Sequence, residues 1–256
     1  MSVIRSILAA IDRTIDRAPK RAAQTLTAAI FLVPALAVLL AFGLVPMGYA
    51  VYMSLFDLTG EPGYIGAGHY REALTGEPFQ NSLAVTAWYA LGTVPVTLVV
   101  SFFIALGLYR ITVLRSFLRT AFFLPYVTST VAAAMIWRVL LEPTYGVANQ
   151  IFGLFGLPAQ RWLLEPRGVL HLLTDGAVPA DAGPSLALCC VILFEIWRSS
   201  GFMIVVFLAG LATVPKELED AARVDGASAL RAMRAVTIPI LSPTIFFLAV
   251  LGVIGT

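Results

Sequence analysis

The chain has 256 residues, of which 59% are hydrophobic and 12% are charged, and its net charge at pH 7 is +2. Soluble globular domains are about 45–50% apolar and about 25% charged, so this composition argues against an ordinary water-soluble domain. The small net charge gives no indication of nucleic-acid binding, and no nucleic-acid partner is expected.

The first 25 residues (1–25) are expected to form a cytoplasmic N-terminal amphipathic segment. Isoleucine and leucine recur at helical spacing from Ile4 to Ile15, with charged residues between them. Such a helix can lie on the inner face of a membrane, and a loosely ordered tail is the alternative. Because its apolar residues are interspersed with charges, the segment does not resemble a cleavable signal peptide.

Four apolar runs are each long enough to cross a bilayer, whose hydrocarbon core of about 30 Å needs about 20 helical residues. Backbone polar groups in lipid must be satisfied within the segment, so these runs predict an all-α membrane protein. A fifth apolar run begins near Thr244. Up to Thr256 it is too short to cross a bilayer, so the sequence is expected to be cut inside a fifth span. The four complete runs are residues 26–55, 82–109, 120–141 and 185–211.

Lysine and arginine are concentrated in alternate connecting segments. Twelve lie before the first span, between the second and third spans, or after the fourth span, whereas three lie in the other two loops. Cytoplasmic segments of membrane proteins carry the excess of these residues. The N-terminus is therefore predicted to be cytoplasmic, and residues 26–81 are predicted to be the first transmembrane helix and an external loop.

The third run carries signals that interrupt a helix. Pro125 removes a backbone hydrogen bond, and the hydroxyl cluster of Thr128, Ser129 and Thr130 follows it. Such hydroxyls either line a hydrophilic path or bond back to their own helix. The external loop after this span, residues 142–184, is long and contains a short amphipathic element. It is either a docking surface for an external partner or a cap over the pore.

The fourth run contains the candidate pathway residues Glu195, Trp197 and Arg198. Ionisable groups inside a span are costly, and by default they are interpreted as functional. Because Glu195 and Arg198 are three residues apart, they can also pair on one helix face for purely structural reasons. Contact with a substrate and structural pairing both remain open interpretations.

Residues 214–243 form a polar segment between two apolar ones, and they predict a helix, a turn and a second helix. Pro215 suits a first helical turn, and acidic residues follow it at the positive end of the helix dipole. Gly226 suits the left-handed position after a helix, and Ser228 can cap the next one. Two interpretations of this segment remain open. It either presents an acidic face with small residues that a partner can approach closely, or it is a solvated linker stabilised by pairs such as Glu219–Arg223.

No catalytic, cofactor-binding or metal-binding constellation is present in the sequence. The phosphate-binding pattern Gly-x-x-x-x-Gly-Lys-Ser/Thr is absent, so the chain is not expected to be an enzyme or to hydrolyse ATP. Cys189 and Cys190 are neighbours in a predicted helix and point in different directions, so neither a disulfide nor a metal site is expected from them.

The stretch ELEDAARVDGA (217–227), followed by TIPILSP (237–243), resembles the EAA loop of the inner-membrane subunits of bacterial ABC importers. The likeness is greatest to carbohydrate-uptake permeases of the maltose and glycerol-3-phosphate type. FFLPYV (122–127), IWRVLLEP (136–143) and the AGL before the loop agree with it. Two positions depart from the family pattern: Asp220 replaces its usual glutamate, and Glu219 stands where an aromatic residue is usual.

The resemblance implies a type I ABC importer transmembrane domain in the bacterial inner membrane, with five of six expected spans present. Residues 82–256 would be the permease core, moving a sugar or sugar derivative. Its partners would be a second permease, two cytoplasmic ATP-binding subunits and an extracytoplasmic substrate-binding protein. The alternative is an ion-coupled secondary transporter or channel that uses Glu195 and Arg198. The residues implied in ATPase coupling are Glu217, Glu219, Asp220, Ala221, Ala222, Asp225 and Gly226.

Overall fold

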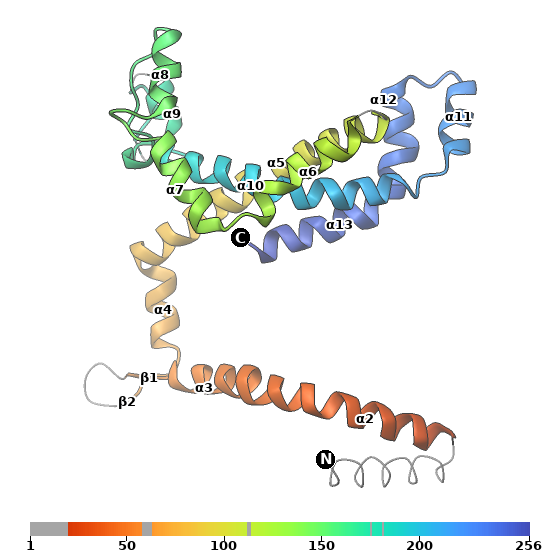
Figure 1. Cartoon of the computed structure of the whole chain (residues 1–256). Helices are drawn as coiled ribbons and strands as arrows, with labels where there is room; N and C mark the ends of the chain where they lie inside the picture. The colour runs from red at the N-terminus through yellow and green to blue at the C-terminus, as the bar shows by residue number, and fades with distance from the viewer. Residues whose placement is uncertain (1–19, 58–62, 112–113, 175, 181) are drawn as a thin grey trace. The chain divides into compact units, whose positions relative to one another are not determined.

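The computed structural model describes residues 20–57, 63–111, 114–174, 176–180 and 182–256. Helices make up most of these residues, and the described part of the chain has one two-stranded sheet (Figure 1). The chain divides into two units, residues 1–80 and residues 81–256. The prediction of an all-α membrane fold is confirmed.

The first unit is built around one long apolar helix. It consists of α2 (Lys20–Leu39), the π-helical segment η1 (Leu40–Leu44) and α3 (Val45–Met53). The π-helical turn lies directly before Pro46, where a proline ring would clash with a carbonyl of regular α-helix. Residues 1–19 of the predicted amphipathic segment lie outside the described residues.

The 27 residues from Thr27 to Met53 of that helix are long and apolar enough to span a membrane, and none of them is buried within the unit. An apolar helix of this kind is stable in lipid without a protein core around it. A short hairpin of β1 (Phe56–Asp57) and β2 (Gly63–Tyr64) follows, and then α4 (Gly68–Thr75).

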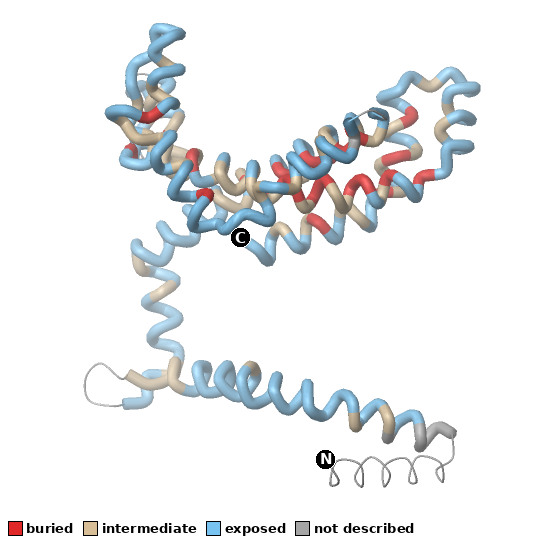
Figure 2. The backbone as a smooth tube through the Cα atoms, in the orientation of Figure 1, coloured by how far each residue is buried: buried red, intermediate tan, exposed pale blue. Residues whose placement is uncertain are grey.

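The second unit contains a core shared by three long helices. They are α5 (Glu77–Arg110, which begins before the unit boundary), α10 (Leu186–Leu211) and α13 (Ile238–Ile254). Figure 2 shows the buried residues gathered where these helices lie together. Phe102 of α5 meets Phe207 of α10 edge to face, with ring centroids 5.6 Å apart. Leu248 of α13 is fully buried in the same core.

The predicted third span is not one straight helix. α6 (Arg115–Val127) and α7 (Thr130–Leu140) meet at an angle of 95°. The expected span over residues 120–141 is therefore a bent pair of helices, either one broken span or a re-entrant loop, and the predicted interruption near the hydroxyl cluster is confirmed. α6 starts five residues earlier than expected, so it includes two of the arginines assigned to the preceding turn.

α6 lies along α10, and a glycine permits the close approach. A side chain added at Gly201 would place its Cβ 2.4 Å from the carbonyl oxygen of Phe122. The Tyr126 ring stacks on Phe202 at 5.3 Å on the same side of α10. In lipid, such van der Waals packing at small residues replaces the hydrophobic driving force between helices.

The loop of residues 142–184, which the sequence predicts to be external, is organised around Asn149. The predicted amphipathic element is α8 (Val147–Leu154), and it is followed by η2 (Trp162–Leu164) and α9 (Val169–Leu173). The Asn149 amide donates to the carbonyls of Pro143 and Gln160, both at 2.9 Å. Its oxygen accepts from the Gln160 backbone N–H and from the Trp162 ring N–H. This one side chain therefore joins both ends of the α8 region.

A second polar contact holds the loop beside the start of α10. Arg167 forms an ion pair with the buried carboxylate of Glu165 at 2.7 Å. The side-chain hydrogen bond from Arg167 lowers the pKa of Glu165 from its ordinary 4.5 to about 2. The Glu165 carbonyl accepts from the backbone N–H of Ala187, so the ion pair lies where the loop meets α10.

The last helix is longer than expected. α12 (Ala229–Ala232), the π-helical segment η3 (Met233–Thr237) and α13 continue without a break, so the candidate span runs over 26 residues, from Ala229 to Ile254. The sequence predicts a fifth apolar run beginning near Thr244, after Pro239 and Pro243. Both lie within the continuous helix instead, and the π-helical turn precedes Pro239 just as η1 precedes Pro46.

Candidate functional site

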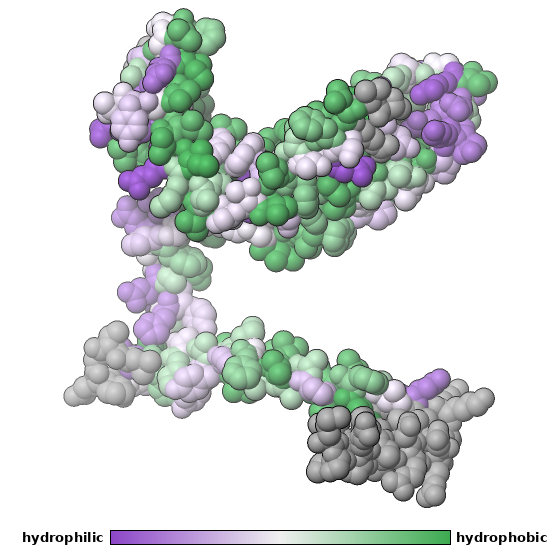
Figure 3. Space-filling view, in the orientation of Figure 1, coloured by the Kyte–Doolittle hydropathy of each residue, from purple (hydrophilic) through white to green (hydrophobic). Residues whose placement is uncertain are grey.

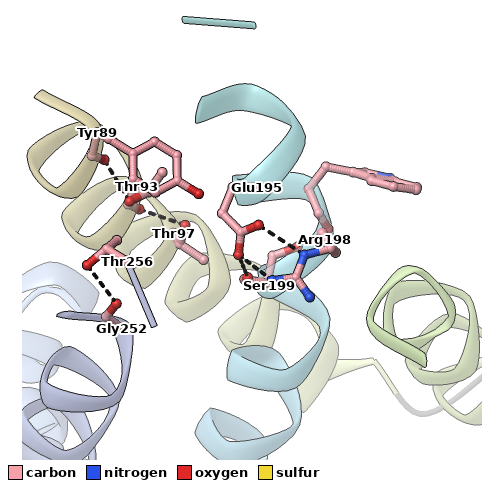
Figure 4. A network of polar contacts seen from close by, with 10 residues as sticks. Tyr89, Thr93, Thr97, Glu195, Arg198, Ser199, Gly252 and Thr256 are labelled. Carbon is pink, nitrogen blue, oxygen red and sulfur yellow. Dashed lines mark hydrogen bonds and ion pairs between the residues drawn. The ribbon is translucent and has the colours of Figure 1, made fainter. Parts of the chain in front are cut away.

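Four helices of the second unit surround a cavity with both polar and apolar walls. α5, α6, α10 and α13 all contribute to it (Figure 4). The apolar part comes mainly from α10 and α13, including Met203, Leu248 and Leu251. The polar lining residues are Thr93, Thr97, Tyr126, Glu195, Arg198, Ser199 and Thr256.

The ion pair between Glu195 and Arg198 forms the charged wall of this cavity. The Arg198 guanidinium donates to both carboxylate oxygens, at 2.7 and 2.9 Å, which confirms the predicted pairing across one helix turn. Ser199 also donates to the Glu195 carboxylate. The two charged side chains are only 18% and 25% exposed. A bidentate pair compensates two charges that would otherwise be costly inside a span.

The opposite wall carries hydroxyl groups from α5. Thr93 and Thr97 are 3% and 2% exposed, and each donates to the backbone carbonyl four residues earlier. Their oxygen lone pairs remain as acceptors at the cavity wall. Figure 4 shows these threonines on the helix that faces Glu195. The sequence prediction missed them, although a repeat of hydroxyls every four residues in an apolar span, continued by Ser101, was the available signal.

The cavity combines acceptors, donors and apolar surface with no net charge from its ion pair. Such a site suits a neutral, hydroxyl-bearing molecule, because each hydroxyl can find a partner and no charge has to be neutralised. In the part of the chain that the structure describes, no group of three or more His, Cys, Asp or Glu side chains could hold a metal ion.

Trp197 is not brought together with the other two candidate pathway residues. It lies on another face of α10, where its ring is 5.8 Å from Trp137 of α7 and 6.2 Å from Phe194. Helical geometry requires this, since Trp197 is about 200° around the helix from Glu195. Thr128 also lies away from the cavity lining, and it donates to its own helix at Leu124.

The polar loop after α10 forms the predicted helix, turn and helix. α11 (Lys216–Val224) is followed by Gly226 in the left-handed conformation, with φ of +77°, and Ser228 caps the next helix by accepting from the Arg231 N–H. Figure 3 shows hydrophilic residues gathered over this hairpin. The cap and the glycine position were both predicted, and both are confirmed.

The seven residues expected to couple to an ATPase do not share one exposed face. Five are exposed, whereas Glu219 and Ala222 are half-buried. The Glu219–Arg223 pair that the solvated-linker alternative would favour does not form: Arg223 pairs with Asp220 at 3.3 Å, and Glu219 accepts from Thr237 at 3.2 Å. The exposed five are Glu217, Asp220, Ala221, Asp225 and Gly226.

One apolar residue at the hairpin was not singled out from the sequence. Val224, at the end of α11, is 88% exposed, and Leu218 on the same helix is 48% exposed. A large apolar side chain so exposed on an otherwise hydrophilic hairpin marks a contact surface when it adjoins other apolar groups.

Comparison with known proteins places the second unit in a known family. A family model described as "Binding-protein-dependent transport system inner membrane component" matches residues 97–256. The probable ABC transporter permease protein YesP of Bacillus subtilis is 32% identical over 229 residues, which cover 88% of this chain and 68% of YesP. The trehalose transport system permease protein SugA of Mycobacterium tuberculosis is 30% identical over 234 residues, or 90% of this chain and 69% of SugA.

A solved structure has the same fold. In the crystal structure of a bacterial ABC transporter involved in the import of the acidic polysaccharide alginate, one chain matches with a TM-score of 0.71 and 22% identity. The match covers 91% of this chain and 74% of that one. At this identity the likeness establishes the fold alone. None of these comparisons supports an ion-coupled transporter or a channel.

Proposed function

Because the chain belongs to the family of inner membrane components of binding-protein-dependent transport systems, the permease subunits of ABC importers, we propose that it imports a sugar or sugar derivative. One similar protein supports a carbohydrate substrate, since SugA is named for trehalose transport. The hydroxyl-lined cavity is compatible with the same chemistry.

The hairpin around α11 is the proposed coupling site, and its geometry is the observation that carries this part of the proposal. It presents exposed acids and an exposed apolar residue, and it continues through α12 and η3 into α13, which lines the cavity. A partner that moves the hairpin would therefore act on a helix of the transport pathway. Two cytoplasmic ATP-binding subunits are the proposed partners, since the sequence carries no phosphate-binding loop of its own.

The remaining assembly follows from the same reasoning. A second permease would complete the pathway across the membrane, and an extracytoplasmic binding protein would deliver the substrate, as the family description indicates. The distribution of lysine and arginine supports a cytoplasmic N-terminus and a cytoplasmic hairpin. Glu195 and Arg198 are the proposed pathway residues, whereas Trp197 contacts aromatic side chains outside the cavity.

The proposal is tested by co-purification of the permease with the ATP-binding subunit. Asp220→Lys reverses the charge of an exposed acid, and Gly226→Pro forbids the positive φ of the turn, so both variants should lose most of the bound ATPase. Glu72→Lys, an equally exposed acid on α4, is the matched control and should capture the ATPase normally. If both hairpin variants bind ATPase and take up labelled trehalose or maltose like the control, the coupling role is wrong.

A further inference from the structure

We propose that the hydrogen bond between Glu219 and Thr237 holds the coupling helix α11 against the last helix of the chain, which makes Glu219 a positioning residue in coupling. The inference rests on the proposed function, because it assigns the path by which motion of the hairpin reaches the transport cavity.

The geometry separates Glu219 from the other acids of α11. Its carboxylate accepts from the Thr237 hydroxyl at 3.2 Å, across 18 residues of sequence. Thr237 is 3% exposed, and Glu219 is half-buried, whereas Glu217 and Asp220 are exposed. One acid therefore faces the membrane helix while its neighbours remain available to a partner in water.

Thr237 also departs from the behaviour of other helical threonines in the described chain. Thr93, Thr97 and Thr128 donate to carbonyls four residues earlier in their own helices. The Thr237 hydroxyl donates instead to a carboxylate of another helix. Because this hydroxyl bonds to a side chain 18 residues away, on a neighbouring helix, the contact is a tertiary one and not a local helix bond.

The contact lies where it can prevent the hairpin from bending independently. α11 is joined to α12 through the turn at Gly226, where a Cβ added to the glycine would meet no atom within 4 Å, so backbone hydrogen bonds hold this turn and no side chain packs against it at that point. At its other end, the hairpin starts from Val214, which is buried in the core of α5, α10 and α13. The Glu219–Thr237 bond adds a third attachment, because it joins the middle of α11 to the end of η3, directly before α13.

Thr237 is directly continuous with the cavity wall. It ends the π-helical segment η3, and α13 starts at the next residue and carries Leu248, Leu251 and Gly252 into the cavity lining. A displacement of α11 is therefore passed to a rigid helix instead of being absorbed at the turn.

The test uses the complete complex with its ATP-binding subunits in lipid nanodiscs, and it measures backbone hydrogen exchange with and without ATP and vanadate. In the wild type, nucleotide should change exchange in residues 245–254 of α13. Glu219→Ala and Thr237→Val should raise exchange of residues 216–224 about tenfold, as expected for loss of a hydrogen bond to a charged group. Both should abolish the nucleotide response of α13 while the ATPase stays bound.

Three further variants decide between a specific contact and general disruption. Glu219→Gln keeps an acceptor and Thr237→Ser keeps a donor, so both should retain the nucleotide response. Thr120→Val removes a hydroxyl that bonds only to its own helix and should match the wild type. If Thr237→Val behaves like Thr120→Val, or Glu219→Gln behaves like Glu219→Ala, the inference is overturned. If the wild-type permease binds no ATPase, it is the proposed function that fails.

Discussion

At the scale of single residues, the most informative feature is a salt bridge inside a membrane helix. Glu195 and Arg198 neutralise each other, yet both line a cavity that is also walled by hydroxyl groups. Removing one partner of a buried ion pair leaves the other charge uncompensated, and this lowers stability more than removing both partners does. This asymmetry allows a structural role and a substrate role to be separated by experiment.

Glu195→Gln should lower both uptake and thermal stability, with a stability loss of about 1–2 kcal/mol, because the pair is partly exposed and screened. The double variant Glu195→Gln with Arg198→Gln should recover the stability but not the uptake of labelled sugar. Uptake restored together with stability would show that the pair is structural only. Thermal unfolding in detergent and uptake in cells are the two measurements.

The Glu165–Arg167 pair predicts a response of the proposed external loop to acid. The folded-state pKa of Glu165 is about 2 and its ordinary value is 4.5, so the folded loop holds the ionised form. Its contribution to stability is complete above about pH 4.5 and is lost as the pH falls towards 2. Hydrogen exchange of residues 165–187, corrected for intrinsic rates, should rise over this interval. Glu165→Gln should show raised exchange at neutral pH and little further change on acidification.

At the scale of elements, the close packing of α6 on α10 depends on a residue without a side chain. Gly201 lies against backbone atoms of Phe122, which cannot rotate away as a flexible side chain can. The same two helices carry the stacked Tyr126 and Phe202, next to the cavity. Separation of the helices would therefore change both the packing and the site.

Gly201→Ala should destabilise the second unit by about 1–3 kcal/mol, as expected for overpacking of a close contact. Gly107→Ala on α5 is the matched control, because a Cβ at that position meets nothing within 4 Å. Thermal unfolding of the purified permease compares the two variants. Equal melting temperatures for both would contradict the close helix contact.

At the scale of the whole molecule, the orientation prediction gives a direct labelling experiment. Val224 is 88% exposed on the proposed cytoplasmic hairpin, and Leu154 is 84% exposed on the proposed external loop. In a background with Cys189 and Cys190 changed to alanine, Leu154→Cys should react with a membrane-impermeant maleimide in intact cells. Val224→Cys should react only after the membrane is opened. The reverse pattern would invert the proposed topology.

The sequence alone determined the class of the protein, the number of apolar runs, and the turn and second helix cap of the hairpin. These properties depend on local composition and spacing: about 20 apolar residues must be helical in lipid, and only particular residues suit a cap or a left-handed turn. For the same reason, the Glu195–Arg198 pair was predictable, since residues three apart on a helix are always neighbours.

Only the tertiary structure decided which side chains meet from different helices. It placed Thr93 and Thr97 opposite Glu195, set the 95° bend between α6 and α7, and directed Glu219 to Thr237 instead of to Arg223. Each of these depends on how helices distant in sequence rotate and pack against one another. Helical spacing fixes the faces of each helix, but the partner of each face is set by packing across the whole unit.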